Sequence, residues 1–324
     1  MAGWLLGALA RVVGLLPWRA LGALGRAVGW LAGSLFRIRR AHVEQAMGIA
    51  GIEAPSRQAD ALYAGLGRSA VEFLWLARRG GEIARHVTID PASAARWRAA
   101  VDAGRGVVIA ASHTGNWDLA ACVMARDIEL LVVTKRLSVA SVDRFWQSTR
   151  AGRGVTLTEA RGAIARSREI LGRGGAVAMM IDQVPARRRA VAVEFLGRPA
   201  SADRAPAALA AAARAPLVVA AARRSSSGDH VLHVLEVIAP PDPEGRSGRA
   251  WIAEATVAAT RALEEFVRAY PSQWLWLHRR WKLPEGGARP DGPSGVDPGA
   301  REATLAPPWS KIRSSSPGEP SRAG

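Results

Sequence analysis

Short apolar runs alternate with amphipathic helical stretches through most of the chain. Runs rich in Val, Ile, Leu and Ala predict strands at residues 106–112, 129–134, 176–182, 190–196, 216–224 and 230–238. Stretches with helical periodicity predict helices at residues 55–83, 117–126, 138–152, 159–173, 202–215 and 250–269. Strands that alternate with helices are typical of α/β proteins. We therefore predict an α/β domain over residues 41–284, with a mixed, largely parallel central sheet flanked by helices.

The first 36 residues follow a different pattern, rich in leucine and glycine and without an acidic residue. On a helix, Arg11, Arg19 and Arg26 fall on one side. The opposite side is apolar and carries Leu6, Leu9, Val13, Leu24, Val28, Leu31 and Leu35. Pro17 is expected to divide the segment into two helices, because proline lacks the amide hydrogen that a helix interior needs. An apolar face beside an arginine stripe is typical of helices in a membrane interface, so residues 1–40 are predicted to form an amphipathic, membrane-anchoring segment.

Two other interpretations of this segment remain open. An amphipathic helix can pack on its own domain, and a tilted helix can span the bilayer. A spanning helix needs about 18 or more apolar residues, whereas arginines interrupt the apolar run here. Arg37, Arg39 and Arg40 follow directly, and the positive-inside rule then places the remainder of the chain on the cytoplasmic side of the membrane.

The composition narrows the class of protein. With 49% hydrophobic and 22% charged residues, the chain as a whole is not disordered. Residues 285–324 are the exception, since they are rich in Pro, Gly and Ser without apolar periodicity, and we predict a disordered tail there. A single cysteine, Cys122, excludes an intrachain disulfide and a zinc site built on several cysteines.

The net charge indicates an anionic partner. Lys and Arg number 44 against 28 Asp and Glu, which gives a formal charge of +16, and nearly all of the basic residues are arginines. Arginine binds phosphate and carboxylate groups through paired hydrogen bonds. The candidate partners of such a charge are nucleic acid, an anionic membrane surface or a phosphate-bearing substrate. The sequence contains no helix-turn-helix, zinc-finger or RNA-binding motif, so we expect no nucleic acid.

The strongest candidate for chemistry follows the predicted strand at residues 106–112. His113 and Asp118 form an H-x4-D motif around the turn residues Gly115 and Asn116. Side chains five residues apart on a helix do not meet, so we place His113 in the loop and Asp118 in the first helical turn. The chain can then fold back so that Asp118 accepts a hydrogen bond from one imidazole nitrogen, which leaves the other nitrogen free as a general base.

The motifs that are missing from the sequence narrow the reaction class. There is no G-x-S-x-G nucleophile motif, no H-E-x-x-H metal motif and no glycine-rich phosphate loop. A His–Asp pair without a protein nucleophile suits direct transfer, in which the histidine deprotonates a substrate hydroxyl that attacks an activated carbonyl. An acyl thioester is the expected electrophile, and neither a metal nor a cofactor is expected.

The motif and four further blocks resemble a known family. His113-Thr114-Gly115-Asn116-Trp117-Asp118 is similar to the H-x4-D/E block of the bacterial lipid A biosynthesis acyltransferases of the lauroyl/myristoyl type. The other blocks follow in the family's order, and they are Arg150-x2-Arg153-Gly154, Met180–Gln183, Glu194–Pro199 and Tyr270–Lys282. The resemblance covers about residues 1–284 and extends to the mycobacterial phosphatidylinositol mannoside acyltransferases of the same superfamily.

The resemblance implies a membrane-bound acyltransferase on the cytoplasmic face of the inner (plasma) membrane, with acyl carrier protein or coenzyme A as the thioester donor. It also implies that His113 and Asp118 are the catalytic residues. Glu194 is a further catalytic candidate, because a glutamate in this region assists the histidine of the mannoside acyltransferases. A lipid-binding relative without activity is an alternative, against which the intact His113 and Asp118 argue.

The blocks also supply candidate substrate-binding residues. Arg150 and Arg153 lie one helical turn apart and are expected to clamp a phosphate of the acceptor or the donor. Asp182 ends an apolar strand, where the sites of open α/β sheets gather, and Gln183 follows it. Arg187 belongs to a loop cluster of arginines that suits anionic headgroups.

The identity of the acceptor stays open at this point. Residues 39–54 lack the Asn-Leu pair that is usual in the family after the basic residues, and the chain is rich in alanine where lipid A enzymes have larger apolar residues. The expected acceptor is therefore a lipid A precursor, a phosphatidylinositol mannoside or a lysophospholipid.

Overall fold

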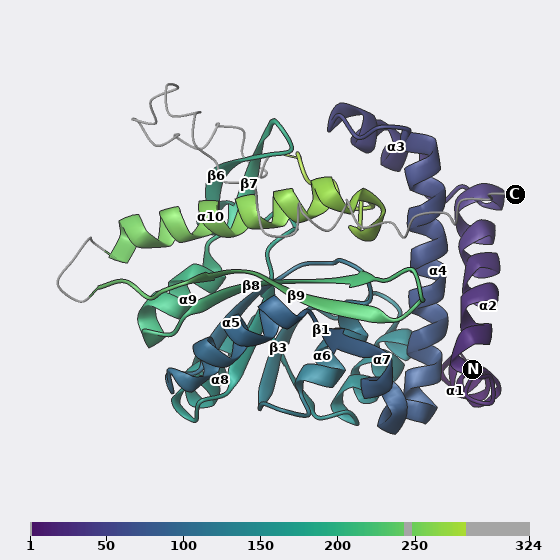
Figure 1. Cartoon of the computed structure of the whole chain (residues 1–324), viewed down its shortest axis with the longest axis horizontal. Coiled ribbons are helices and arrows are strands. Elements are labelled where there is room, and N and C mark those ends of the chain that lie inside the picture. Colours follow the sequence, from purple (N-terminus) through teal and green to yellow (C-terminus); the bar gives the residue numbers. More distant parts are fainter. Residues whose placement is uncertain (1, 243–247, 283–324) are drawn as a thin grey trace, which may run out of the picture. The chain divides into compact units, whose positions relative to one another are not determined.

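The computed structural model describes residues 2–242 and 248–282, and seven of its strands form one central sheet (Figure 1). The strand order is β1-β9-β8-β2-β5-β3-β4. The bounds are β1 (Val87–Ile89), β2 (Val107–Ala111), β3 (Leu130–Thr134), β4 (Val155–Glu159), β5 (Ala176–Met180), β8 (Leu217–Arg224) and β9 (His230–Ile238). Every neighbouring pair is parallel except β8 and β9. The predicted mixed, largely parallel sheet is thus confirmed.

A separate two-stranded hairpin consists of β6 (Ala190–Phe195) and β7 (Arg198–Asp203). Its two turn residues, Leu196 and Gly197, have φ values of 53° and 76°. Left-handed backbone at both central positions is what a tight hairpin turn requires. The strand predicted at residues 190–196 therefore exists, but it belongs to this hairpin and not to the central sheet.

Helices cover both faces of the central sheet. Beyond the N-terminal segment they are α3 (Arg40–Ile49), α4 (Pro55–Arg79), α5 (Pro91–Asp102), α6 (Trp117–Met124), α7 (Ala140–Ala151), α8 (Ala163–Gly172), α9 (Ala205–Ala213) and α10 (Gly248–Ala269). Alternate residues of β2 point to opposite faces. Val108 and Ala110 join one core cluster together with α9 and α10, and Val107 and Ile109 join another with α5 and α6. Burial on both faces explains why the parallel strands are continuous apolar runs in the sequence.

The N-terminal segment forms α1 (Ala2–Val13) and α2 (Trp18–Trp30), followed by a π-helical turn (Leu31–Leu35). Pro17 directly precedes α2, so the predicted division into two helices is confirmed. Gly25 and Gly29 of α2 lie against the backbone of α4, where a side chain at Gly29 would overlap the Tyr63 carbonyl group. Of the larger side chains of α2, Leu21 is buried and Trp18 is half-buried against the core, whereas Leu24, Val28 and Trp30 are exposed.

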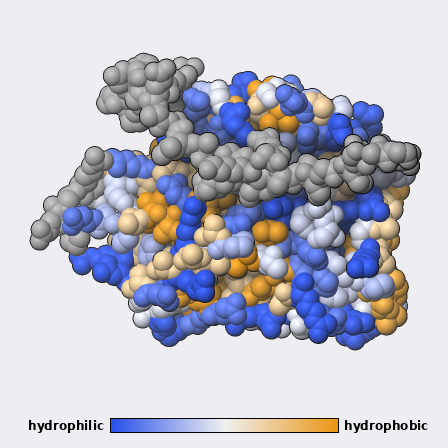
Figure 2. Space-filling view, in the orientation of Figure 1, coloured by the Kyte–Doolittle hydropathy of each residue, from blue (hydrophilic) through white to orange (hydrophobic). Residues whose placement is uncertain are grey.

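Most of the apolar face predicted for this segment is exposed. The exposed apolar residues of α1, α2 and the following turn include Leu9, Leu24, Val28, Leu31 and Leu35 from that face, together with Trp4, Trp30 and Phe36. Val13 is buried, Leu6 is half-buried, and Arg11, Arg19 and Arg26 are exposed. Figure 2 shows apolar side chains along the right edge, where Figure 1 places α1 and α2. The segment thus packs on its own domain through one side and exposes apolar residues on the other.

Across the described part of the chain, the structure contains no helix with the length and hydrophobicity of a membrane span. The boundary predicted at residue 40, between an anchoring segment and the α/β domain, stays a prediction. The predicted disordered tail, residues 285–324, lies outside the described residues.

Candidate active site

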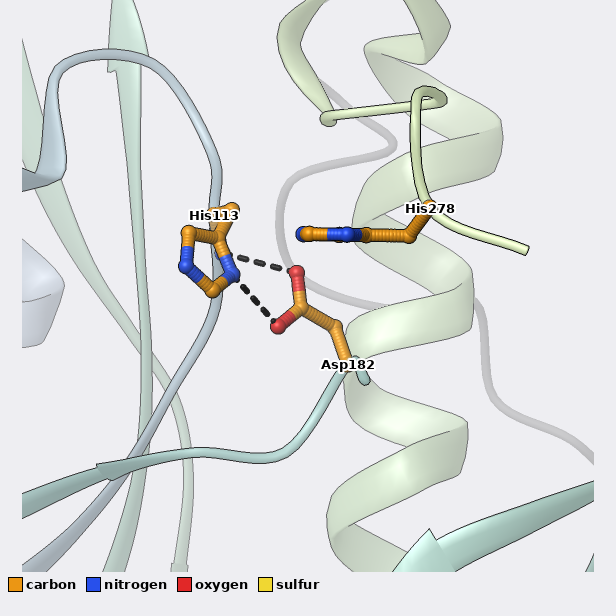
Figure 3. Close-up of side chains that lie close together, drawn as sticks. All are labelled: His113, Asp182 and His278. Atoms are coloured by element: carbon orange, nitrogen blue, oxygen red, sulfur yellow. Dashed lines mark hydrogen bonds and ion pairs between the residues drawn. The ribbon is translucent and has the colours of Figure 1, made fainter. Parts of the chain in front are cut away.

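The loop after β2 holds His113 against a carboxylate from the neighbouring strand (Figure 3). Nδ1 of His113 lies 2.8 Å from Oδ1 of Asp182, and the backbone N–H of His113 donates to Oδ2 over 2.8 Å. The indole N–H of Trp274 donates to the same Oδ2 over 3.0 Å. Asp182 follows β5, which pairs with β2 in parallel, so the carboxyl ends of two adjacent strands bring the pair together.

The electrostatics of the pair determine which nitrogen of His113 carries the proton. Burial alone would raise the pKa of Asp182, but the charge of the His113 imidazole and its hydrogen bonds hold that pKa well below its usual value. Burial lowers the pKa of His113, but the charge and hydrogen bond of Asp182, with a smaller contribution from Asp118, raise it above its usual value. Because the carboxylate is ionised, Nδ1 of His113 carries the proton and donates it, which leaves Nε2 as the basic nitrogen.

The predicted hydrogen bond between His113 and Asp118 is replaced by this pair. Asp118 lies in the first turn of α6, as expected, but its Oδ1 forms an ion pair with Nε of Arg150 at 3.6 Å. Burial raises the pKa of Asp118 above its usual value. The charge of Arg150 and a hydrogen bond with the Trp146 side chain offset only part of this rise. The prediction chose the wrong partner because sequence spacing favours a local aspartate, whereas strand pairing places Asp182 beside the loop.

Thr114, Gly115 and Asn116, which follow His113, each have a contact that fixes the turn. Oγ1 of Thr114 accepts from the Ala222 backbone N–H over 3.0 Å. Gly115 has a φ of 56°, and a Cβ there would lie 2.6 Å from the Ala222 carbonyl oxygen, so a glycine is required. Its N–H donates to the Gln273 carbonyl over 2.8 Å. Oδ1 of Asn116 accepts from the Leu119 N–H and caps α6.

His278 is a second histidine of the site, which the sequence analysis missed. Its ring centroid lies 5.0 Å from that of His113 (Figure 3). Burial lowers its pKa to about 4, against the pull of Asp182, so it is neutral at pH 7. His278 and Trp274 lie far from His113 in the sequence, and no local pattern identified either as part of the site.

A metal ion is one conceivable occupant of this cluster, because ligand-type atoms of His113, Asp182 and His278 lie within 4.8 Å of one another. The carboxylate of Asp182, however, already accepts three hydrogen bonds, from Nδ1 and the backbone N–H of His113 and from Trp274. The 2.8 Å separation of Nδ1 and Oδ1 is a hydrogen-bond distance, shorter than the roughly 3.3 Å between two ligand atoms that each lie about 2 Å from a tetrahedral ion. The cluster therefore fits a hydrogen-bonded pair better than a metal site.

Arg150 lies in the site, whereas Arg153 does not. The side chain of Arg150 is buried, stacks over the Trp146 ring at 4.5 Å, and leaves its Nε without a hydrogen-bond partner. Nη2 of Arg153 instead donates to the carbonyls of Leu76 and Ala77 over 2.9 and 3.1 Å, at the carboxyl end of α4. The structure therefore does not bring the two arginines of the predicted clamp together, because the guanidinium of Arg153 caps the end of α4.

The remaining predicted residues lie at different distances from the pair. Gln183 lines the same cavity as His113, and its Nε2 is 3.5 Å from Nε2 of His278. Arg187 is exposed in a short 3-10 turn (Arg187–Arg189) before β6. Glu194 is exposed in the hairpin opposite Pro199 and lines none of the cavities beside His113, so the structure does not bring it to the histidine.

Two cavities adjoin beside the pair. An apolar cavity of about 360 Å³ lies between the sheet and α6, and Asp118 is among its few polar residues. A wider cavity of about 850 Å³ contains His113, Gln183 and His278 in its wall. Residues that line both are Trp117, Val132, Arg150 and Met180. The wider cavity also has several basic residues in its wall, namely Lys135, Arg136, Arg161 and Arg189.

This arrangement can remove a proton from a group in the wider cavity, next to a space for an apolar chain and near fixed positive charge. No individual curated protein matches the chain significantly. The family model for the bacterial lipid A biosynthesis acyltransferases matches residues 1–283, which include all the residues that the structure describes. The protein therefore belongs to the bacterial lipid A biosynthesis acyltransferase family.

Proposed function

We propose that this protein transfers a fatty acyl chain from an acyl thioester to a hydroxyl of a lipid A precursor or a related glycolipid or lysolipid. The single observation that carries the proposal is the His113–Asp182 pair where an apolar cavity meets a wider cavity with basic walls. The family match supports acyl transfer in lipid A biosynthesis. The donor, the acceptor and the roles of the residues below are our proposal.

In the proposed reaction, Nε2 of His113 takes the proton of the acceptor hydroxyl, and the oxygen attacks the thioester carbonyl carbon. The tetrahedral intermediate collapses, the carbon–sulfur bond breaks, and the thiolate leaves with the proton that His113 returns. Asp182 holds the Nδ1–H and stabilises the imidazolium that forms in between. No acyl-enzyme is needed, and no metal or cofactor takes part in these steps.

Other residues bind the two substrates. The apolar cavity accepts the hydrocarbon chain of the donor, and the basic walls of the wider cavity accept phosphate groups of the acceptor or of the donor's carrier. Arg150, at the junction of the cavities, places a positive charge where negative charge develops on the carbonyl oxygen. Gln183 contacts bound substrate from the wall, and Arg187 attracts anionic headgroups from the surface.

The N-terminal helices bring the protein to its acceptor. The exposed apolar residues of α1 and α2 lie beside exposed arginines, which suits a bilayer with anionic lipids. We propose that this surface docks on the cytoplasmic face of the inner membrane, where acyl carrier protein or coenzyme A delivers the donor from the cytosol. The acceptor hydroxyl is then a group of a lipid that already lies in the bilayer.

Purified protein, incubated with acyl-acyl carrier protein or acyl-coenzyme A and each candidate acceptor in mixed micelles, tests the proposal. We expect one acceptor to gain one acyl chain. His113→Asn is the matched variant, because asparagine keeps an N–H donor near Asp182 but has no basic nitrogen. Its rate is expected to fall by about 10²–10⁴. A variant that retains a tenth of the wild-type rate would remove His113 from the mechanism.

The lipids of a strain that lacks the gene identify the acceptor in the cell. We expect a lipid species that is one acyl chain short, and mass spectrometry shows whether it is lipid A, a mannoside or a phospholipid. A missing chain on a mannoside or a phospholipid would keep the chemistry and replace the acceptor. An unchanged lipid profile would contradict the proposed acyl transfer to a membrane lipid.

A further inference from the structure

A buried cluster of charged residues contacts the catalytic turn outside the two cavities described above. It consists of Glu72 on α4, Arg224 at the end of β8 and His230 at the start of β9. Their side chains are 3%, 6% and 0% exposed. Oε2 of Glu72 accepts from Nη2 of Arg224 and from Nε2 of His230, both over 3.0 Å, and Oε1 accepts from Nη1 of Arg224. None of these residues belongs to the mechanism described above.

The charge state of the cluster follows from its contacts. Burial would raise the pKa of Glu72, but the hydrogen bond from His230 and the charge of Arg224 lower it, so the carboxylate is ionised. Burial lowers the pKa of His230, so its ring is neutral and carries its proton on Nε2. The other ring nitrogen, Nδ1, is buried without a hydrogen-bond partner. The cluster is therefore an ionised Glu72–Arg224 pair supported by a neutral histidine.

One contact joins this cluster to the turn. Nδ2 of Asn116 donates to Oε2 of Glu72 over 2.9 Å, while Oδ1 of the same amide accepts from the Leu119 N–H over 3.3 Å. Asn116 thus connects the buried carboxylate to the first turn of α6, three residues after His113. Arg224 is linked to the turn through Gln273. The backbone N–H of Arg224 donates to Oε1 of Gln273 over 3.0 Å, and the Gln273 carbonyl accepts from the Gly115 N–H in the turn.

A buried ion pair is a costly way to stabilise a fold, since apolar residues of similar volume are often as stabilising or more so. It does restrict the geometry of the groups that bond to it, because each oxygen has directed contacts that would be lost on movement. The amide of Asn116 is such a group, and the imidazole of His113 depends on the same turn. A displacement of about 1 Å in a reacting group can cost about a hundredfold in rate.

We infer that Glu72 is a positioning residue, which fixes the His113 turn through its hydrogen bond to Asn116. The inference rests on the proposed function, since the turn matters for rate only if His113 is the base. Glu72 contacts no substrate. Its effect is expected on kcat and not on the KM for either substrate, because Glu72 lines neither of the two proposed substrate cavities, nor the small cavity that His113 shares with Arg224.

Three variants and a control test this role. Glu72→Gln removes the charge with little change in volume. Asn116→Asp keeps the helix cap, since aspartate caps as well as asparagine, but it replaces the donor to Glu72 by a second carboxylate, which repels the first. In the double variant the new amide at position 72 can donate to the new carboxylate at position 116. Tyr63→Phe is the matched control, because it removes a buried hydrogen bond from the same helix, to the Ile38 carbonyl, without touching the turn.

We expect each single variant to lower kcat by about tenfold to a hundredfold with an unchanged KM. The double variant should lose no more than the worse single variant, because both changes act on one contact. Tyr63→Phe should keep kcat within about twofold even where its melting temperature falls as far as that of Glu72→Gln. A Glu72→Gln kcat within twofold of wild type, or single losses that multiply in the double variant, would overturn the inference.

Amide hydrogen exchange gives a measurement that does not depend on activity. The Leu119 N–H donates to Oδ1 of Asn116. Glu72→Gln should speed hydrogen exchange at this amide, and Tyr63→Phe should not. Unchanged exchange at Leu119 would contradict the positioning role. If the wild-type protein transfers no acyl chain while this exchange response is seen, the proposed function fails and the structural link stands.

Discussion

The turn that holds His113 has buried polar groups with hydrogen-bond partners, whereas α1 and α2 expose many of their large apolar side chains and bury Gly25 and Gly29 against α4. The turn gains its geometry from directed hydrogen bonds to Asp182, Ala222 and Gln273. The surface of α2 gains its apolar face because Gly25 and Gly29 contact α4 in place of larger residues. The His113 turn is therefore held in one geometry by directed contacts, whereas α1 and α2 leave apolar surface area exposed for contact with another surface.

The largest effect is expected where the paired polar groups are broken. Asp182→Asn should lower the transfer rate by about 10²–10⁴, because the imidazole loses the carboxylate that orients it and stabilises its charge. Asp118→Asn should lower it less, since the hydrogen bond to Nδ1 remains. Steady-state rates of both variants, with circular dichroism as a check of folding, measure the difference. A larger loss in Asp118→Asn would return the orienting role to the local aspartate.

A smaller effect, on membrane binding, is expected from the exposed apolar residues. Replacing Leu24 and Leu31 by Gln should weaken binding to anionic vesicles by at least about tenfold, because a buried leucine contributes about 1.5–3 kcal/mol. Stability should change by less than about 0.5 kcal/mol per site, since both side chains are exposed. Vesicle sedimentation and thermal unfolding measure the two quantities.

Gly29→Ala is the counterpart on the buried side of α2. The added methyl group overlaps the Tyr63 carbonyl, so it should destabilise the protein by about 1–3 kcal/mol. If the Leu variants unfolded the protein and Gly29→Ala did not, the outward orientation of the apolar face would be wrong.

The arginine stripe should contribute less per residue than the leucines. Arg11, Arg19 and Arg26 are each expected to add about 1 kcal/mol to binding on an anionic surface. Their joint replacement by Gln should therefore abolish most of the salt dependence of vesicle binding. Binding that does not respond to salt in the wild-type protein would mean that the arginines do not face the lipid.

No effect on rate is expected from the single cysteine. Cys122 is buried in α6, and burial raises the pKa of its thiol to about 12, so it is not a nucleophile at neutral pH. Cys122→Ala should keep the rate within about twofold. An acylated enzyme trapped with labelled thioester in the absence of acceptor would contradict direct transfer.

The sequence predicted those strands of the fold that are buried on both faces. Runs such as residues 176–181 are continuously apolar because helices cover both sides of β5. β4 and β1 were missed because both are short: β4 alternates apolar and polar residues as a half-buried strand does, but over only five residues, and β1 has only three. β7 was missed because its polar sequence is typical of a loop, and it forms only by pairing with β6.

The sequence indicated His113 and Asp182 as separate site residues but did not predict that they form a hydrogen-bonded pair. The spacing of the motif indicated His113, and the end of an apolar strand indicated Asp182. Only the strand order, which places β5 beside β2, makes Asp182 the partner of the imidazole. Local patterns contain no information on this order, and for the same reason they could not indicate His278.

The protonation of His113 tests the central claim most directly. Nitrogen-detected NMR of the labelled imidazole reports its pKa and its neutral tautomer. The charged and titratable groups that face the ring are Asp182, Asp118 and His278. We predict a pKa above 6.5 with the neutral proton on Nδ1 in the wild-type protein, and a fall below 6.5 in Asp182→Asn, where burial then dominates. Asp118→Asn should give a smaller fall and keep the tautomer. A pKa that is unchanged in Asp182→Asn but falls in Asp118→Asn would contradict the account.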